Sequence, residues 1–382
     1  MDDFVKAERE VKREGEPVQV ERFREQVLNA AANKRALRIR GGGTKDWYGQ
    51  TFDGEILDTR AYSGIVDYEP TELVITARCG TPLADIEEAL AERRQMLAFE
   101  PPHFGDGATL GGVIASGMSG PRRAASGGVR DFVLGAVMMD GRGDVLSFGG
   151  QVMKNVAGYD VSRLLAGSLG TLGLMLQHSI KVLPLPMRES TLRFGMDEIE
   201  ALRRLNEWGG QPLPISASCW HDGVLTVRLS GAEAAVEAAS RMLGGEVLDE
   251  GWHFWRALRE QRHAFFARPG SLWRLSVPSA TGAIILKGEQ LIEWGGAQRW
   301  LMLEAGADAG PDAGPDAGAQ ARAMVDNIRR AVAATGGHAT LFRGGDKSVG
   351  VFQPLAPAVA KIHARLKAAF DPSQIFNPGR MY

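Results

Sequence analysis

Two glycine-rich segments, beginning at residues 40 and 105, constrain this 382-residue chain more than any other feature. The first, residues 40–44, reads RGGGT and ends the strand-like segment 36–40. The second, residues 105–128, has eight glycines in 24 residues, whereas the whole chain has 48 in 382. Glycine lets a backbone approach a ligand closely and lets successive N–H groups converge on an anion. The two segments therefore predict a dinucleotide cofactor that lies across two backbone cradles.

Composition excludes several classes of protein. The formal net charge is −2, without the basic excess that is typical of nucleic-acid-binding proteins. The two cysteines, Cys79 and Cys219, stand at no metal-ligand spacing. We therefore expect neither a disulfide scaffold nor an iron–sulfur cluster, which needs about four thiolates, and no metal site. If the chain carries out redox chemistry, its electrons must leave through something that the chain does not carry.

Nothing in the hydropathy pattern predicts a membrane segment. No apolar run approaches the ~18 residues of a membrane-spanning helix. The first residues, MDDFVKAEREVKRE, lack the apolar core of a signal peptide. We expect a cytoplasmic protein that would reach a membrane only through its partners.

The common nucleotide-binding motifs are missing from the sequence. It has no G-x-G-x-x-G fingerprint, and the Gly-Lys pair of a Walker A loop does not occur. The H-E-x-x-H and G-x-S-x-G motifs are absent as well. The nucleotide site must be of another kind.

Hydrophobic periodicity and turn residues predict two domains. In the first, helices are expected at 18–32, after Thr81-Pro82, at 109–116 and at 160–167, and strands at 36–40, 72–78, 133–140, 145–148 and 173–183. Thr81 is expected to be the N-cap of its helix, with Pro82 at the first helical position. Pro184 and Pro186 then interrupt the pattern, and we place a boundary after residue 187. In the second, residues 188–345, helices are expected at 197–208, 232–243, 253–266 and 321–335, and strands at 215–219, 224–229, 272–277 and 300–303. Residues 305–319, with AGPD repeated, predict a flexible insertion, and 356–370 predicts a last helix.

Several candidate site residues admit two interpretations. Residues 40–44 form either a tight turn or a pyrophosphate cradle, and the second glycine segment favours the cradle. Arg122 and Arg123 either lie on a solvated surface or bind a carboxylate, a phosphate or a partner's acidic surface. His103 is either a structural histidine or a general base. We name His103, Arg122 and Arg123 as the catalytic candidates.

Taken together, the motifs resemble the flavoprotein family of vanillyl-alcohol-oxidase type. In order they are RGGGT at 40–44, ATLGG at 108–112, VRDFVLG at 129–135, KNVAGYD at 154–160, GSLGTLG at 167–173, FDP at 370–372 and NPG at 377–379. The resemblance implies an α+β fold: a two-part FAD-binding domain, residues 1–187, an α+β cap domain, residues 188–345, and a C-terminal segment, residues 346–382, that returns to the FAD-binding domain. EPPH at 100–103, GPRR at 120–123 and the ending NPGRMY are most similar to the smaller FAD-binding subunits of bacterial glycolate oxidase complexes.

The resemblance also implies a cofactor site. The residues expected to bind FAD are Arg40, Gly41, Gly42, Gly43, Thr44, Gly107, Ala108, Thr109, Gly111, Gly112, Ser116, Gly117, Gly170, Gly173 and Asn377. Relatives that attach FAD covalently often carry histidine where this chain has Thr44, so we expect non-covalent FAD. Leu169 stands where many relatives have glutamate, and the paired histidines of the larger flavin subunits are absent, which leaves the catalytic base open.

The implied function is two-electron oxidation of glycolate or another small 2-hydroxy acid. The implied assembly adds a larger FAD-binding catalytic subunit and an iron–sulfur subunit that takes the electrons. Two alternatives stay open. One is a non-catalytic electron-transfer or assembly subunit whose flavin never meets substrate, and the other is an autonomous FAD oxidase of another small alcohol or hydroxy acid.

Overall fold

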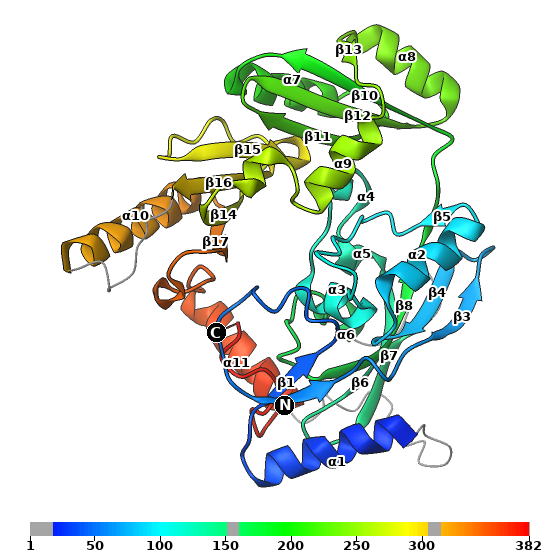
Figure 1. Ribbon diagram of the computed structural model, residues 1–382, viewed down its shortest axis with the longest axis vertical. Helices are drawn as coiled ribbons and strands as arrows, with labels where there is room; N and C mark the ends of the chain where they lie inside the picture. The colour runs from blue at the N-terminus through cyan, green and yellow to red at the C-terminus, as the bar shows by residue number, and fades with distance from the viewer. Residues whose placement is uncertain (1–17, 151–159, 305–314, 382) are drawn as a thin grey trace. The chain divides into compact units, whose positions relative to one another are not determined.

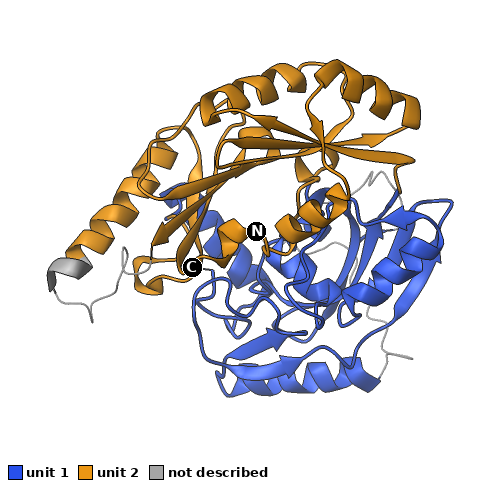
Figure 2. Ribbon diagram, turned by 45° about the horizontal axis from the view of Figure 1, so that its top comes forward, with its two compact units in different colours: residues 1–118, 128–184, 354–382 blue, residues 119–127, 185–353 orange. Residues whose placement is uncertain are grey.

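The computed structural model describes residues 18–150, 160–304 and 315–381. The chain divides into two compact units (Figure 2). Unit 1 comprises residues 1–118, 128–184 and 354–382, and unit 2 comprises residues 119–127 and 185–353. The expected domain limits were 187/188 and 345/346, so both lie within eight residues of this division. The sequence did not predict that residues 119–127 belong with the second unit.

Unit 1 is built on a five-stranded sheet in the order β3-β4-β8-β6-β7, with every neighbouring pair antiparallel (Figure 1). Its strands are β1 (Leu37–Arg40), β2 (Glu55–Asp58), β3 (Ile65–Glu69), β4 (Val74–Arg78), β5 (Gln95–Met96), β6 (Val133–Met139), β7 (Val145–Gly149), β8 (Leu174–Lys181) and β9 (Leu183–Pro184). Its helices are α1 (Val18–Ala32), α2 (Leu83–Glu92), α3 (Leu110–Ser116), α5 (Val129–Phe132), α6 (Val161–Leu164) and α11 (Pro357–Phe370).

Two apolar cores lie on the two faces of this sheet. Met138 and Met175 pack with α2 and α3 in one core. Met139 and Leu174, one position along each strand, pack with α1, β1 and β2 in the other. Successive side chains of a strand point to opposite faces, so a doubly covered sheet buries nearly every residue of β6 and β8, and the sequence of β6 is accordingly a near-continuous apolar run.

Unit 2 is built on an eight-stranded antiparallel sheet in the order β13-β10-β12-β11-β15-β16-β14-β17. Its strands are β10 (Arg188–Gly195), β11 (Ile215–His221), β12 (Val224–Gly231), β13 (Glu246–Val247), β14 (Gly270–Ser276), β15 (Glu289–Glu293), β16 (Gln298–Glu304) and β17 (His338–Arg343). Its helices are α4 (Arg123–Ser126), α7 (Glu198–Gly209), α8 (Glu233–Leu243), α9 (Gly251–Arg259), α10 (Pro315–Ala333) and the 3₁₀ turns η2 (Ala264–Ala267), η3 (Trp294–Gly296) and η5 (Lys347–Val349). Helices α7 and α8 cover β10 and β12, and α10 covers β14, β16 and β17.

The α+β class and most of the expected elements are confirmed. Three local expectations were wrong. Thr81 does not cap α2; its hydroxyl bonds the backbone of Gly64 instead, and Pro82 occupies the N-cap without a side-chain bond. Residues 315–319, assigned to the flexible insertion, are the first turn of α10, while 305–314 lie outside the described residues. Several strands were not expected at all: β2, β3, β15, β17 and β10, which follows directly after the prolines.

The C-terminal segment returns to unit 1 and pairs with β1 through an isolated bridge beside the two-stranded β1–β2 sheet. Phe376 pairs in parallel with Leu37, whose amide donates to the Ile375 carbonyl at 2.7 Å, and the Asn377 amide donates to the Leu37 carbonyl at 2.9 Å. Strand β1 ends at Arg40, where the first glycine loop begins. The chain end therefore helps to fix the position of that loop.

A buried ion pair holds this return. The Lys367 ammonium donates to Asp371 Oδ2 at 2.6 Å and to the carbonyls of Thr171 and Phe376, each at 2.7 Å. Asp371 is fully buried and also accepts the backbone amides of Ile375 and Phe376. Burial lowers the pKa of Lys367, and the bond to Asp371 opposes that shift. Because all three ammonium donors are used, the charge is tolerated in the interior.

We predict that Asp371→Asn destabilises unit 1 by about 3–5 kcal/mol, because it leaves the Lys367 charge buried without its anion. Chemical denaturation measures the change in the free energy of unfolding. Glu55→Gln, which removes a carboxylate from the exposed pair with Arg35, is the control and should cost at most about 1 kcal/mol. Equal effects of the two substitutions would show that the buried pair does not hold the C-terminal segment.

Candidate functional site

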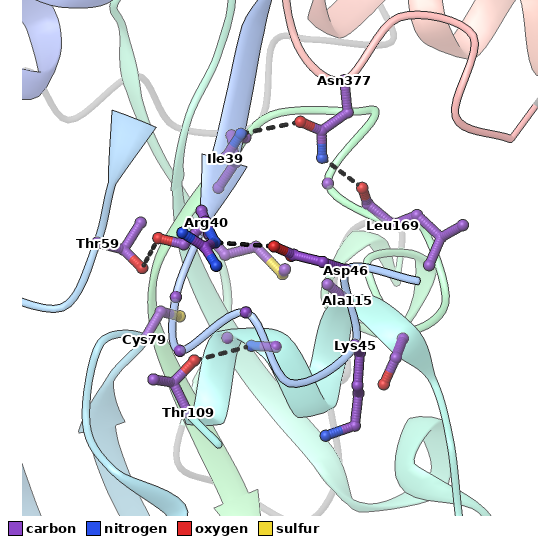
Figure 3. A pocket seen from close by; sticks show the side chains of 18 of the residues that line it. Ile39, Arg40, Lys45, Asp46, Thr59, Cys79, Thr109, Ala115, Leu169 and Asn377 are labelled. Carbon is purple, nitrogen blue, oxygen red and sulfur yellow. Dashed lines mark hydrogen bonds and ion pairs between the residues drawn. The ribbon is translucent and has the colours of Figure 1, made fainter. Parts of the chain in front are cut away.

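A cavity in unit 1 lies between the two glycine loops and the returning C-terminal segment (Figure 3). It is lined by Ile39, Arg40, Gly41, Gly42, Gly43, Thr44, Lys45, Asp46, Tyr48, Thr59, Cys79, Thr109, Gly111, Gly112, Ala115, Ser116, Leu169, Gly170, Gly173, Met175, Asn377 and Arg380. Every cofactor-binding residue expected from the sequence is among them, apart from Gly107, Ala108 and Gly117. The structure thus gathers residues from the two ends of the chain around one hollow.

The three exceptions pack behind the residues that line the cavity. The carbonyl of Gly107 packs against the backbone of Gly42, and the carbonyl of Ala108 accepts the amide of Leu83 at the start of α2. Gly117 ends α3 in the left-handed conformation, with φ of 65°, and a Cβ there would lie 2.8 Å from the Cα of Gly167. These residues are needed for close backbone packing, and they do not line the cavity.

The first glycine loop lies directly against the second. A Cβ on Gly42 would lie 1.5 Å from the Gly107 carbonyl oxygen, and one on Gly41 would lie 2.3 Å from the hydroxyl of Thr109. That hydroxyl accepts the amide of Gly112 and so caps α3. No other residue type fits at position 42 unless the two loops separate.

The backbone amides of residues 41–44 form a run of donors along the cavity. Within the part of the chain that the structure describes, these four N–H groups donate no hydrogen bond. All four residues are half-buried and line the cavity. Because buried backbone donors are nearly always satisfied, a run of four such amides in one loop fits an anionic ligand.

The charges of the lining match such an anion. Arg40, Lys45 and Arg380 supply three cations and Asp46 one anion, a net of +2. Lys45 Nζ donates to the carbonyl of His103 at 3.1 Å and lies 5.5 Å from the centre of the Phe104 ring. A dinucleotide's pyrophosphate carries about two negative charges at neutral pH, so lining and ligand are complementary.

Asn377 joins the C-terminal segment to two walls of the cavity. Its Oδ1 accepts the Ile39 amide at 2.9 Å, and its Nδ2 donates to the Leu169 carbonyl at 2.6 Å (Figure 3). Leu169 has a φ of 52°, and a Cβ on Gly170 would lie 2.8 Å from Asn377 Nδ2. The asparagine holds the GSLGTLG turn against β1, and this contact explains why both glycine and asparagine occur there.

Cys79 lines the cavity but is not a reactive group. It is buried, and burial raises the pKa of its thiol far above the usual value. Its carbonyl accepts the Gly111 amide at 2.8 Å. A thiol held in the neutral form is a poor nucleophile, so we assign Cys79 a packing role.

The three catalytic candidates fall in different units. His103 belongs to unit 1, where its Nε2 lies 2.9 Å from Glu87 Oε2. Arg122 and Arg123 belong to unit 2. Arg122 is buried and its guanidinium bonds Glu189 Oε1 at 2.5 Å, and the Arg123 guanidinium lies 4.5 Å from the centre of the Trp294 ring. Each candidate therefore has a structural contact of its own.

The structure also bears on residues that the sequence reasoning missed or left open. Lys45, Asp46, Tyr48, Thr59 and Arg380 line the cavity and were not expected to. The sequence KDWYG after RGGGT and the arginine after NPG were the available signals. The KNVAGYD motif lies outside the described residues apart from Asp160, which caps α6.

Among described residues no three His, Cys, Asp or Glu side chains are grouped to hold a metal ion, and no described helix is long and apolar enough to cross a membrane.

Comparison with known proteins agrees with this geometry. Residues 16–149 match the family model of an FAD binding domain. The chain is 48% identical over 358 residues to the glycolate oxidase subunit GlcE of Escherichia coli (strain K12), covering 94% of this chain and 96% of that protein. It is 32% identical over 164 residues to the glycolate oxidase subunit GlcD of Bacillus subtilis (strain 168), covering 42% of this chain and 35% of that protein.

A solved structure of p-cresol methylhydroxylase with substrate bound shares the fold. The TM-score is 0.71 at 15% sequence identity, over 94% of this chain and 87% of that one. At this identity the likeness concerns the fold alone.

We predict that Gly42→Ala abolishes retention of FAD through purification and lowers the melting temperature of the protein, because the added Cβ must push the two loops apart. Flavin absorbance per chain and a thermal melt measure the two effects. Gly195→Ala, where an added Cβ meets nothing within 4 Å, is the control and should keep FAD. Normal FAD content in Gly42→Ala would show that the observed loop contact is not needed for the cofactor.

Proposed function

The chain belongs to the family of the glycolate oxidase subunit GlcE, and on that premise we propose that it is the FAD-binding subunit of a glycolate oxidase complex. In this proposal glycolate or another small 2-hydroxy acid loses two electrons and two protons and becomes a 2-oxo acid. The electrons leave through an iron–sulfur partner subunit, since the two cysteines of this chain, Cys79 and Cys219, are too few for a cluster.

The observation that carries the proposal is the cavity of unit 1. The four amides of residues 41–44, which have no acceptor among the described residues, and a net lining charge of +2 fit a pyrophosphate. FAD bound there supplies two-electron redox chemistry by accepting a hydride from the substrate carbon. Thr44, the residue that follows the three glycines, is neither histidine nor cysteine, which is consistent with non-covalent FAD.

Around the cofactor we assign roles to this chain's own residues. Residues 41–44 hold the pyrophosphate with their backbone amides. Thr109, Gly112 and Ser116 line the flavin and ribityl chain. The backbone of residues 170–173 lies toward the adenine side, and Asn377 approaches the flavin from the C-terminal segment.

For catalysis we propose His103 as the base that removes the hydroxyl proton, with Glu87 orienting its imidazole. Arg122 or Arg123 is proposed to bind the substrate carboxylate, as an arginine can with two parallel hydrogen bonds.

One observation favours a second candidate function, an electron-transfer or assembly subunit whose flavin never meets substrate. Arg122 is already bonded to Glu189, and the Arg123 guanidinium is stacked on Trp294. Both arginines thus serve the internal packing of unit 2. In this reading the larger FAD-binding catalytic subunit oxidises the acid, and this chain relays electrons or supports assembly.

We propose the same partners under both readings. They are a larger FAD-binding subunit and an iron–sulfur subunit, with this chain in the cytoplasm and attached to a membrane only through them. Affinity purification of the tagged chain from its own cells, followed by mass spectrometry and iron analysis, tests this. Recovery of the chain alone, without iron, would contradict the proposed assembly.

A visible spectrum decides between the two functions. We expect the purified chain to show a flavin band near ~450 nm, and anaerobic glycolate or D-lactate to bleach it if the chain is catalytic. A band that persists in the isolated chain, but bleaches when the partner subunits are added, supports the electron-transfer function. No band after incubation with FAD would overturn both.

If the chain is catalytic, we predict that His103→Asn slows substrate-driven bleaching by about 100-fold or more while FAD content stays normal, because the proton acceptor is lost. Stopped-flow absorbance measures the rate. His253→Asn, which changes an exposed histidine of α9, is the control. Bleaching at the wild-type rate in His103→Asn would remove His103 from the mechanism, and the same experiment with Arg122→Ala and Arg123→Ala tests the two arginines.

A further inference from the structure

The cavity lining contains a carboxylate where an anionic ligand is expected. Asp46 follows the first glycine loop, and its side chain is about one-quarter exposed. A negative charge beside a pyrophosphate is unfavourable, so electrostatics alone would select against an acid at this position. The contacts of Asp46 give the reason for its presence.

One oxygen of Asp46 holds two arginines of β1. Arg40 Nε donates to Asp46 Oδ2 at 2.8 Å (Figure 3). Arg38 lies 3.0 Å from the same oxygen. The Arg40 side chain folds back over its own loop, since a Cβ on Gly43 would lie 2.5 Å from its guanidinium. Gly43 has a φ of 74°, so both its backbone conformation and the guanidinium above it favour glycine.

The segment that carries Asp46 is itself held from the C-terminus. The Arg380 guanidinium donates to the carbonyls of Lys45 at 3.2 Å and Tyr48 at 3.0 Å, and the Gln50 amide donates to the Arg380 carbonyl at 2.8 Å. Arg38 and Arg380 both lie over the Phe52 ring, at 5.9 and 5.4 Å from its centre. Asp46 is therefore a fixed anchor for the Arg40 guanidinium.

Arg380 is a second observation that favours an anionic ligand beside Arg40 and Asp46. Its side chain is 93% buried and lines the cavity. Among the described residues its Nε has no hydrogen-bond partner, and the same holds for the Nε of Arg38. Arg38 and Arg40 thus share one carboxylate oxygen, and Arg380 holds the backbone of the same segment and lines the cavity.

We propose that Asp46 is a positioning residue for the cofactor: its carboxylate holds Arg40 over the first glycine loop, where the guanidinium meets the FAD pyrophosphate. This inference rests on the proposed FAD site. It makes a prediction opposite in sign to simple electrostatics. Removing this negative charge should weaken the binding of a negatively charged ligand, because Arg40 loses its anchor.

The test is the dissociation constant of FAD for the full chain, measured by fluorescence titration after the native cofactor has been removed. We expect Asp46→Asn to raise the constant about tenfold, and Arg40→Met to raise it at least as much. In the Arg40→Met background, Asp46→Asn should change it by less than about twofold, because the two substitutions act through one contact.

The matched control is Asp58→Asn. Asp58 lies opposite Arg40 in the β1–β2 pair, but its side chain bonds Arg60 and not Arg40. The hydrogen bond from Arg60 is the main cause that lowers the pKa of Asp58, and the charge of Arg40 contributes least. The substitution removes the same charge from the same neighbourhood and leaves the anchor intact. FAD affinity should be unchanged or slightly higher.

Three results would overturn the proposal. The first is unchanged or tighter binding of FAD by Asp46→Asn. The second is an equal loss of FAD affinity when Asp46→Asn is introduced into the wild type and into Arg40→Met. If the cofactor-free Asp46→Asn protein has a melting temperature far below that of the wild type, the Arg40→Lys variant is tested in its place, because lysine keeps the charge but not the guanidinium. Wild-type affinity for FAD in Arg40→Lys is the third result. Failure of the unaltered chain to bind FAD would contradict the proposed function and not the role of Asp46.

Discussion

The buried pair of Lys367 and Asp371 is the interaction on which the cofactor cavity depends. It lies between α11 and the final residues of the chain, and the ammonium also reaches the carbonyl of Thr171 in the GSLGTLG turn. A buried charge that loses its partner costs far more than a surface ion pair contributes. The chain end therefore has one favourable arrangement, in which residues 375–377 pair with β1 and Asn377 bridges Ile39 and Leu169.

From that anchor the rest of the cavity follows by backbone contact. Strand β1 is held on one side by β2 and on the other by the C-terminal segment, so the loop that leaves it at Arg40 starts from a fixed point. The loop then lies against Gly107 and Thr109 so closely that its first two glycines admit no side chain. An anion cradle made of amides needs this rigidity, because it binds well only if the N–H groups converge before the ligand arrives.

Much of this was readable from the sequence, and the failures have physical reasons. Val18–Ala32 was predicted to the residue because its apolar positions have a clean helical period, and the hairpin of β6 and β7 because a Gly-Arg-Gly-Asp turn separates two apolar strands. β10 was missed because its sequence, RESTLRFG, mixes charged and polar residues with only two large apolar ones. Its pairing with β12 and β13 stabilises the strand, which the intrinsic β-propensity of the sequence does not. Thr81 has the residue type of an N-cap, yet a tertiary partner, the backbone of Gly64, competes for its hydroxyl.

The cavity shows the same division between local pattern and tertiary contact. Glycines 41–43 could be recognised because only a few backbone functions require three in a row. For Asp46 and Arg380 the only signal was their position next to a motif, and that position does not show which groups their charges contact, since their contact joins segments 334 residues apart. The separation has a further consequence. Residues from Ile39 to Arg380 line one cavity, so a ligand bound there stabilises the folded position of each segment that it contacts. Its binding free energy therefore adds to the stability of unit 1. Cofactor affinity and the integrity of unit 1 are thus two measures of one set of contacts, in which the C-terminal segment participates as fully as the glycine loops.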